Sequence, residues 1–280
     1  MIKLGICNEL FEDWDFAKVC STVKGLGYDG LEIAPFTLAP LITDLSNERR
    51  SELRGIIADE GLETIGLHWL LARTEGFYLT SPDRATRLAT GDYLRALAQA
   101  ARDLGGSLLV LGSPKQRNLL PGVDARSAVG YAAEVLSRIS PELDGLGVDL
   151  CFEPLAASET DFINTCDEAL ELIGMVGGSR VKLHLDVKAQ SGEAGASVPE
   201  LFRKHAARAG HVHVQDPNLR GPGMGDLDFA PIMRALVDAG YSRYASVEVF
   251  DYSPGALETA RLSIACLREA RRAATTRTHS

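Results

Sequence analysis

The chain has 280 residues, 45% of them hydrophobic, which is enough to bury one large core. Its formal net charge of −9 disfavours a nucleic-acid partner, because binding a phosphate backbone requires a concentrated basic face. The five cysteines include no CxxC pair, so reduced thiols are expected, with neither a disulfide framework nor a thiolate zinc site. Neither a leader-like segment nor a run of about 18 apolar residues is present, so we expect a cytoplasmic protein with no membrane partner.

Short apolar runs alternate with longer helical patterns along the chain, without a Pro/Ser-rich linker, which is typical of a parallel α/β fold. The expected strands are residues 2–7, 30–34, 64–68, 108–112, 148–153, 181–186, 211–215 and 245–249. Eight such units predict a single-domain (β/α)8 barrel over residues 1–270, followed by a frayed tail, 271–280. A doubly wound open sheet is the main alternative, but the turn after the first strand lacks the glycines that such a sheet normally places there.

Local signals between these strands predict where helices begin and end. Helix starts are indicated by two capping boxes and two prolines, namely Thr165 with Glu168, Ser197 with Glu200, Pro82 after Ser81, and Pro254 after Ser253. Gly61 and the pair Gly105-Gly106 indicate helix ends, because glycine readily adopts the left-handed conformation that terminates a helix.

Polar residues recur on the face of the strands that should fill the barrel. Side chains of a strand alternate with period two, so in VKLHLDVK the apolar residues face the helices and the polar ones face inward. The same alternation in the other strands predicts an inward polar set: Glu32, His68, Asp149, Cys151, Glu153, Lys182, His184, Asp186, Lys188, His211, His213, Gln215, Ser246 and Glu248.

Four of these residues stand at or near the carboxyl ends of neighbouring strands, where active sites of such barrels lie: Glu153, Asp186, His213 and Glu248. An unpaired buried carboxylate costs several kcal/mol, so a shared divalent cation is the simplest explanation for the cluster. Three carboxylates and one imidazole suit Mn²⁺, with Mg²⁺ or Co²⁺ as alternatives. Any one of these acids alone would more often belong to an ordinary ion pair, and we interpret His184 and His211 as hydrogen-bonded core histidines.

An ordered set of segments resembles the xylose isomerase-like superfamily of sugar isomerases and epimerases. The segments are YDGLEIAPF (28–36), GLHWLLA (66–72), LGSPKQRNL (111–119), FEPLAASETDFINT (152–165), HLDVKA (184–189), HVHVQDPNLRGPGMGDLDF (211–229) and SVEVF (246–250). The resemblance to its ketose 3-epimerases implies Glu153, Asp186, His213 and Glu248 as metal ligands, and Glu159 and Arg220 as substrate-binding residues. Ala156 and Ala189 replace an asparagine and a histidine usual in these epimerases. The resemblance therefore does not indicate which sugar is the substrate.

The resulting hypothesis is an isomerase or epimerase that removes and replaces a proton next to a carbonyl through a metal-bound cis-enediolate. Glu153 and Glu248 are the expected proton-transfer groups, on opposite faces of the substrate. His68, Trp69 and Lys188 are further candidate substrate contacts. Lys115 and Arg117 are more simply explained as solvated rim residues, and the segment 221–225 as either a mobile lid or a tight turn.

Three other functions stay open at this point. The same chemistry serves a dehydratase or lyase acting on an inosose, a 3-keto sugar or a 3-keto glycoside. A metal-dependent endonuclease of the superfamily would need further ligands and a basic groove, which this acidic chain does not offer. A non-catalytic subunit is the third alternative. Because family members often form dimers or tetramers, a homo-oligomer is the macromolecular partner that the resemblance implies.

Overall fold

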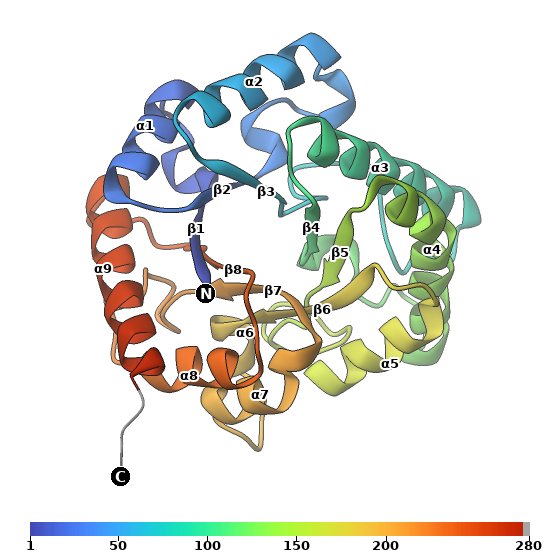
Figure 1. The fold of residues 1–280 in the computed structure, drawn as a ribbon. Coiled ribbons are helices and arrows are strands. Elements are labelled where there is room, and N and C mark those ends of the chain that lie inside the picture. The colour runs from blue at the N-terminus through green and yellow to red at the C-terminus, as the bar shows by residue number, and fades with distance from the viewer. Residues whose placement is uncertain (277–280) are drawn as a thin grey trace.

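The computed structural model describes residues 1–276 and contains a closed barrel of parallel strands in the order β1 to β8 (Figure 1). The strands are β1 Lys3–Cys7, β2 Gly30–Ile33, β3 Glu63–Leu67, β4 Leu108–Leu111, β5 Asp149–Phe152, β6 Val181–Asp186, β7 Ala209–Val214 and β8 Tyr244–Val247. Each strand pairs with the next along the chain, and β1 pairs with β8 to close the barrel. The predicted single-domain (β/α)8 barrel is therefore confirmed, and the open-sheet alternative is excluded.

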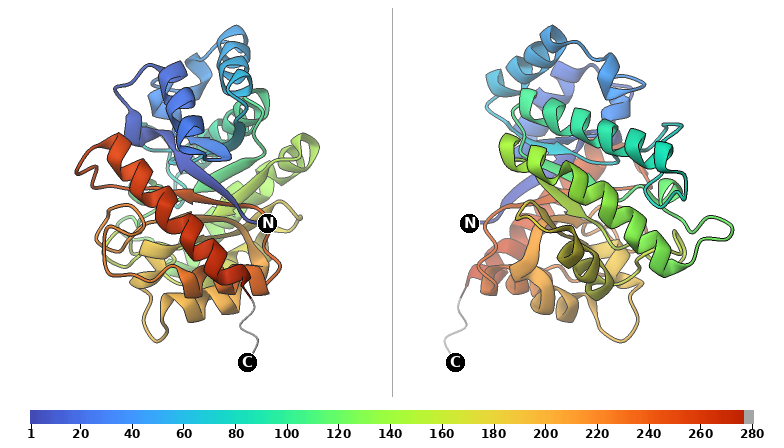
Figure 2. Two further views of the ribbon diagram at one scale, coloured as in Figure 1. Left: turned by 60° about the vertical axis from the view of Figure 1, so that its left-hand side comes forward. Right: turned by 90° about the vertical axis from the view of Figure 1, so that its right-hand side faces the viewer.

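Helices surround the strands as an outer ring (Figures 1 and 2). The helices are α1 Phe16–Leu26, α2 Asn47–Asp59, α3 Arg84–Asp103, α4 Ala125–Leu146, α5 Cys166–Val176, α6 Val187–Ser191, α7 Val198–His205, α8 Ala230–Asp238 and α9 Ala256–Thr275. The short helix α6 is an addition between β6 and α7, and it begins directly after Asp186. A helix at this position sets the direction of the chain at the carboxyl end of β6.

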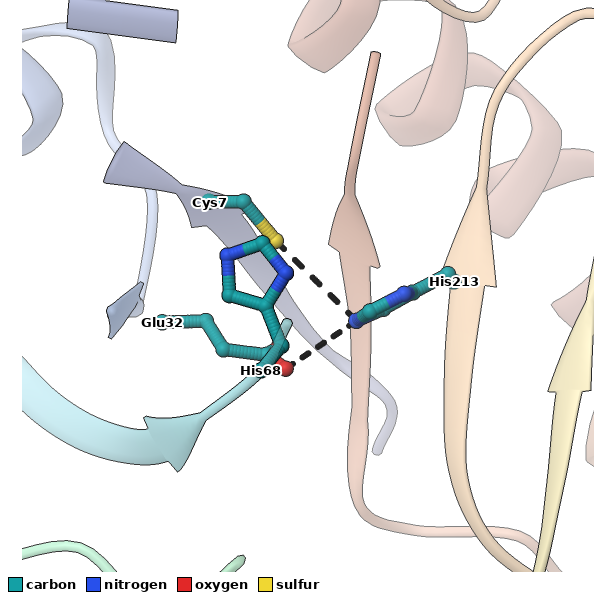
Figure 3. Close-up of side chains that lie close together, drawn as sticks. All are labelled: Cys7, Glu32, His68 and His213. Carbon is teal, nitrogen blue, oxygen red and sulfur yellow. Dashed lines mark hydrogen bonds and ion pairs between the residues drawn. The ribbon is translucent and has the colours of Figure 1, made fainter. Parts of the chain in front are cut away.

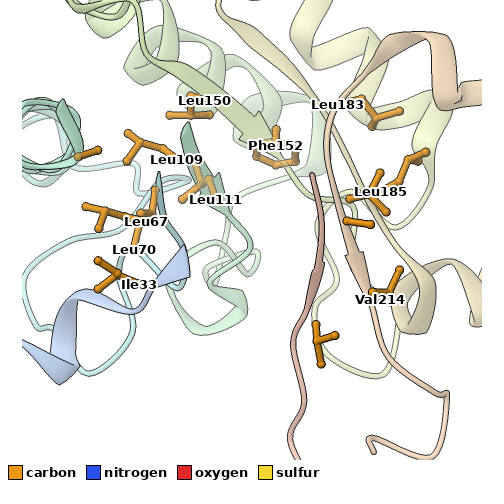
Figure 4. Packing of buried hydrophobic residues seen from close by; sticks show 14 of the residues in the cluster. Ile33, Leu67, Leu70, Leu109, Leu111, Leu150, Phe152, Leu183, Leu185 and Val214 are labelled. Carbon is orange, nitrogen blue, oxygen red and sulfur yellow. The ribbon is translucent and has the colours of Figure 1, made fainter. Parts of the chain in front are cut away.

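The main core lies between the strands and the helix ring. Outward-facing residues such as Leu150, Phe152, Leu183 and Leu185 are fully buried there and pack in one cluster with the helices (Figure 4). Each such leucine stabilises the fold by roughly 1.5–3 kcal/mol relative to an exposed one. A smaller apolar cluster, Ile65, Leu108, Val110 and Cys151, fills the inside of the barrel. Other inward positions carry glycines, such as Gly5 and Gly210, or buried polar side chains, such as Glu32 and His211.

The expected helix boundaries are confirmed where side-chain caps carry them and are wrong at two prolines. Both capping boxes are present, at Thr165 with Glu168 and at Ser197 with Glu200, and Gly61 and Gly105 follow helices with positive φ. Helix α3 begins at Arg84, after Pro82, because the carboxylate of Asp83 accepts hydrogen bonds from the backbone N–H groups of residues 85 and 86. Helix α9 begins at Ala256, two residues after Pro254.

The last helix extends beyond the expected end of the barrel domain. Helix α9 runs to Thr275, into the segment 271–280 that we expected to fray, whereas residues 277–280 lie outside the described part. Two contacts stabilise this extension: Ala274 is buried in the core, and Arg271 Nη1 donates to the carbonyl oxygen of Ile2 at 2.7 Å. The helical pattern alone did not reveal that this segment packs on the core and is hydrogen-bonded to Ile2, the residue before β1.

The five cysteines are all free thiols, as expected. Among residues 1–276, no helix combines the length and the apolar character needed to cross a lipid bilayer.

Two glycines test the packing of the barrel. A Cβ at Gly66 on β3 would lie 2.0 Å from the carbonyl oxygen of Leu108 on β4, whereas a Cβ at Gly91 in α3 would meet only ordinary contacts, the nearest at 3.7 Å. We expect Gly66→Ala to lower the free energy of unfolding by about 3 kcal/mol, because backbone cannot move away. Gly91→Ala should raise it by about 0.5–1 kcal/mol through helix propensity. Urea denaturation measures both, and equal stability of the two variants would contradict the packing described.

Candidate active site

Acidic and imidazole side chains converge at the carboxyl ends of strands β5 to β8. Asp186 is the last residue of β6 and is paired in register with His213 of β7, while Glu153 and Glu248 directly follow β5 and β8. All four are buried, with exposed fractions between 0% and 6%. The alternation rule therefore placed these four side chains inside the barrel correctly.

Three of the four side chains lie close enough to share one ion. Asp186, His213 and Glu248 each offer a ligand atom, and these atoms lie within 4.8 Å of one another. Glu153 stands apart from this group but lines the same cavity of about 80 Å³, together with Asp186 and Glu248. Its carboxylate occupies the space that a side chain at position 112 would take, because a Cβ at Gly112 would lie 2.0 Å from Glu153 Oε2.

The orientation of His213 is set from inside the barrel by Glu32 of β2 (Figure 3). His213 Nε2 donates to Glu32 Oε1 at 3.0 Å, and both side chains are fully buried. His213 Nδ1 faces Glu248 Oε2 at 3.2 Å but makes no hydrogen bond to any described residue. Two acceptor atoms at this distance repel each other unless a cation or proton lies between them. Burial opposes protonation of His213, but Glu32 and Glu248 raise its pKa, so a proton on Nδ1 would satisfy this contact, and a cation between the two atoms would do the same.

His68 holds Glu248 from the opposite side. Its Nδ1 lies 3.0 Å from Glu248 Oε1, and its Nε2 lies 2.9 Å from Glu9 Oε2. Burial opposes protonation of this imidazole, but Cys7 and Glu9 raise its pKa well above the ordinary value. His68 is completely buried, does not line the cavity and contacts Glu248, so its side chain helps to orient Glu248, and the expected substrate contact of His68 stays a prediction. Sequence reasoning missed Glu9 because it lies in a 3-10 turn after β1, where strand alternation has ended.

The three carboxyl groups differ in their electrostatic surroundings. Burial, followed by the neighbouring Asp186 and Glu248, raises the pKa of Glu153 well above its usual range. Burial and Glu248 raise the pKa of Asp186 to about 6. Burial also opposes ionisation of Glu248, yet His213 and His68 lower its pKa to about 2. Burial and mutual repulsion thus oppose ionisation of all three carboxyl groups together, and a bound cation would offset that repulsion.

Two aromatic rings and one ion pair form the remaining walls of the acid cavity. Trp69 and Phe250 stack with ring centroids 5.3 Å apart and an interplanar angle of 14°. Glu159 and Lys188 form an ion pair that lines the same cavity, and Lys188 Nζ lies 5.6 Å from the centre of the Phe250 ring. Three of the sequence candidates, Trp69, Glu159 and Lys188, are thus brought to the acid cluster.

Arg220 lies outside the cavity wall. Its Nη2 donates to the carbonyl oxygen of Ser253 at 3.0 Å, and its Nε lies 3.6 Å from Asp251 Oδ2, so the β8 loop holds it at the rim. The segment 221–225 beside it is organised by Asp216, whose carboxylate accepts from the backbone N–H groups of Gly223 and Leu227. This anchoring favours the tight turn over the mobile lid.

Arg117 is buried, and the expectation that it is a solvated rim residue was wrong. Only 1% of it is exposed, and it donates to the carbonyl oxygens of Glu153, Phe162 and Ile163 at 2.7 to 3.2 Å. Its guanidinium also lies 4.8 Å from the centre of the Phe152 ring. Arg117 therefore ties the end of β5 to the loop that carries Glu159. The sequence placed Arg117 just after a strand, but it did not reveal that the loop carrying Glu159 folds over this arginine.

Two further histidines, His184 and His211, and a second group of potential metal ligands lie inside the barrel. His211 Nε2 lies 2.7 Å from Glu32 Oε2, as expected of a hydrogen-bonded core histidine, but neither nitrogen of His184 has a partner among the described residues. Cys7, Glu32, His68 and His213 form another group of potential ligand atoms. Burial raises the pKa of the Cys7 thiol to about 12, so it offers a protonated and weak ligand there. The group of Asp186, His213 and Glu248 suits a divalent cation better, because carboxylates and imidazole are its preferred donors.

Known proteins of similar sequence act on sugars. A D-psicose 3-epimerase of Enterocloster bolteae is 30% identical over 258 residues, which cover 88% of this chain and 81% of that protein. A fructoselysine 3-epimerase of Shigella flexneri is 24% identical, with 80% of this chain and 81% of that protein covered. These relatives confirm the expectation of an enzyme of the sugar epimerase and isomerase class.

Solved structures show the same fold. An L-ribulose 3-epimerase superposes with a TM-score of 0.84 at 23% identity and full coverage of both chains. A 3-keto-D-glucoside 4-epimerase from E. coli superposes with a TM-score of 0.82 at 20% identity, covering 96% of this chain and all of that one. The family model described as xylose isomerase-like TIM barrel matches residues 20–270. The chain belongs to the xylose isomerase-like TIM barrel family.

Proposed function

We propose that this chain is a metal-dependent epimerase of a ketose or a closely related keto sugar. The observation that carries the proposal is the convergence of ligand atoms of Asp186, His213 and Glu248 within 4.8 Å, next to a cavity that Asp186 and Glu248 line together with Glu153. The named relatives support the same conclusion, because two of them are a psicose and a fructoselysine 3-epimerase. Both names describe inversion at a carbon of a keto sugar, and the side chains of this site are suited to inversion next to a carbonyl.

Asp186, His213 and Glu248 would hold one divalent cation, with Glu153 completing the ligand set, and Mn²⁺ is the ion we favour. When bound, the ion supplies Lewis acidity that makes the hydrogen next to the substrate carbonyl removable. Glu32 supports this arrangement by keeping the proton of His213 on Nε2, which leaves the Nδ1 lone pair for the ion. Asp186 is likewise held in place, because its Oδ1 accepts from the N–H of Ala189 at 2.6 Å.

Glu153 and Glu248 are the proposed proton-transfer groups. Both carboxyl groups line the cavity, and each is held from behind, Glu248 by His68 and the backbone of Glu153 by Arg117. One removes the proton from the carbon next to the carbonyl, and the other returns a proton to the opposite face, which inverts the configuration. Fixed orientation matters here because proton transfer requires the carboxylate oxygen within hydrogen-bond reach of the reacting carbon.

The walls of the cavity define the proposed substrate contacts. The stacked rings of Trp69 and Phe250 offer an apolar face to the C–H side of a sugar. Glu159 and Lys188 offer an acceptor and a donor to its hydroxyl or carbonyl oxygens, once the ion pair between them opens. Arg220 at the rim would meet the far end of a longer substrate.

Solvent deuterium exchange tests the proton-transfer roles. The Mn²⁺-loaded protein should incorporate deuterium at the reacting carbon of D-psicose, L-ribulose or a 3-keto glucoside. Glu153→Gln and Glu248→Gln should each slow incorporation by about 10²–10⁴-fold, because the amide cannot accept the proton. Glu258→Gln, at a half-exposed residue of α9 that pairs with Arg261, is the control. Full exchange in either site variant would refute its role, and loss of water or of an aglycone from the substrate would identify a lyase.

Gly112→Ala tests whether the placement of Glu153 matters. The new methyl group would occupy the position of the Glu153 carboxylate, a flexible side chain that can move aside. We therefore expect thermal stability within about 1 kcal/mol of the parent, but at least about tenfold lower kcat, because the carboxylate loses its alignment. Gly130→Ala in α4, whose Cβ meets nothing within 4 Å, is the matched control. Unchanged kcat in Gly112→Ala would show that the observed position of Glu153 is not required.

Glu32→Gln tests the support of His213. The amide can accept only one of the two imidazole hydrogen bonds, so Mn²⁺ affinity measured by calorimetry should fall by about 10–100-fold. Nitrogen-15 spectra of the histidine rings should show a changed tautomer of His213. Glu134→Gln on α4, which is exposed and pairs with Arg87, should leave both measurements unchanged. Parental Mn²⁺ affinity in Glu32→Gln would remove Glu32 from the proposed site.

A further inference from the structure

A second and larger cavity opens at the amino ends of the strands. Its volume is about 560 Å³, within the range of ordinary small-molecule sites, whereas the acid cavity has about 80 Å³. Its lining includes Lys3, Glu63, Asp149 and Tyr244, which are the first residues of β1, β3, β5 and β8. The cavity is thus at the opposite end of the barrel from the proposed active site, and nothing in the proposed reaction uses it.

The charge of this basal cavity is opposite to that of the chain. Four cationic side chains line it, Lys3, Arg54, Arg180 and Arg243, against the carboxylates of Glu63 and Asp149. This leaves an excess of two positive charges in a protein whose formal net charge is −9. A cationic hollow in an acidic protein concentrates small anions.

The cationic side chains of the basal cavity carry more N–H donors than its two carboxylates accept. Asp149 is nearly fully buried and receives Arg180 Nη1 at 3.1 Å, Arg243 Nη1 at 2.7 Å and Lys182 Nζ at 2.7 Å. The Nε of Arg180 also lies 3.7 Å from Asp144 Oδ1. Arg243 Nη1 also donates to the carbonyl oxygen of Gly210 at 3.1 Å. Each guanidinium carries five N–H donors, so Arg180 and Arg243 retain N–H groups beyond these contacts. Arg54 also lines the cavity and takes part in none of the ion pairs found among residues 1 to 276.

His211 adds a polar group to the wall of the same cavity. It is 1% exposed, and its Nε2 makes the hydrogen bond to Glu32. With the proton on Nε2, Nδ1 accepts a hydrogen bond and suits a ligand hydroxyl. Ser107 and Ser242 provide two more hydroxyl groups along the lining.

We propose that the basal cavity binds the phosphate monoester of a small polyol. Two excess positive charges match a phosphate dianion, and guanidinium groups bind phosphate oxygens through paired N–H donors. The hydroxyl groups of the polyol face His211 and the two serines. Because the catalytic end of such barrels lies at the carboxyl ends of the strands, this ligand acts as an effector that stabilises the fold.

Calorimetry at constant ionic strength on the full-length, metal-loaded protein tests the site with sorbitol 6-phosphate, inorganic phosphate and sorbitol. We expect saturable one-site binding of sorbitol 6-phosphate. Arg54→Gln/Arg180→Gln should weaken it by at least about tenfold, because charge-assisted contacts are lost. Asp149 keeps Lys182 and Arg243 in this variant. If it does not fold, Arg54→Gln alone, which breaks no ion pair, should weaken binding by about threefold.

Two controls separate the basal cavity from other binding. Arg261→Gln on the exposed face of α9 and Lys188→Met in the acid cavity should both keep the parental affinity. Tighter binding of sorbitol 6-phosphate than of inorganic phosphate supports the polyol contacts, and equal binding supports a site for the phosphate group alone. The proposal is overturned if neither phosphate binds saturably, if sorbitol binds as well as its phosphate, if the arginine variants keep full affinity, or if Lys188→Met removes binding. None of these outcomes depends on epimerase activity.

Discussion

The hydrogen bonds that Glu32 accepts from two histidines organise the interior of this barrel. The carboxylate is completely buried, and His211 and His213 contact its two oxygens at 2.7 and 3.0 Å. A carboxylate in this position costs several kcal/mol when unpaired, so the fold depends on both imidazoles being present and correctly turned. The same contact that satisfies Glu32 directs His213 Nδ1 toward Asp186 and Glu248. The same hydrogen bonds therefore stabilise the core and set the geometry of the proposed site.

A second chain of contacts, from Glu9 through His68 to Glu248, repeats this principle on the other side of the site. Together the two chains connect β2 and β7 with the segments that follow β1, β3 and β8, and they meet where His213 faces Glu248. Side chains locked by buried hydrogen bonds cannot rearrange freely, so the proposed ligands are held in place before an ion binds. Arg117 extends this rigidity to the loop of Glu159. The family relationship explains the fold, while these contacts explain how this chain supports its own acid cluster.

The two ends of the barrel have opposite electrostatic character. At the carboxyl ends, carboxyl groups crowd a small cavity and favour a cation; at the amino ends, arginines outnumber the acids of a larger cavity and favour an anion. His211 and His213 alternate along β7 with Val212 between them, and Glu32 links the two histidines inside the barrel. One strand thus contributes a polar group to each end, which a barrel packed only with apolar side chains could not do.

By itself, the sequence determined the number and order of the strands and the inward direction of Glu32, Asp186, His213 and Glu248. It could do so because these depend on period-two alternation and on local turn signals, which a few neighbouring residues establish. Where alternation stops, prediction stopped too: Glu9 follows β1 in a 3-10 turn, and Arg117 lies in a loop whose path is set by distant segments. Only the tertiary structure decided that His68 orients Glu248 and does not line the cavity, that Arg220 lies at the rim, and that a cationic cavity opens at the amino ends of the strands. Each of these depends on contacts between residues far apart in the chain, whose distances no local pattern encodes.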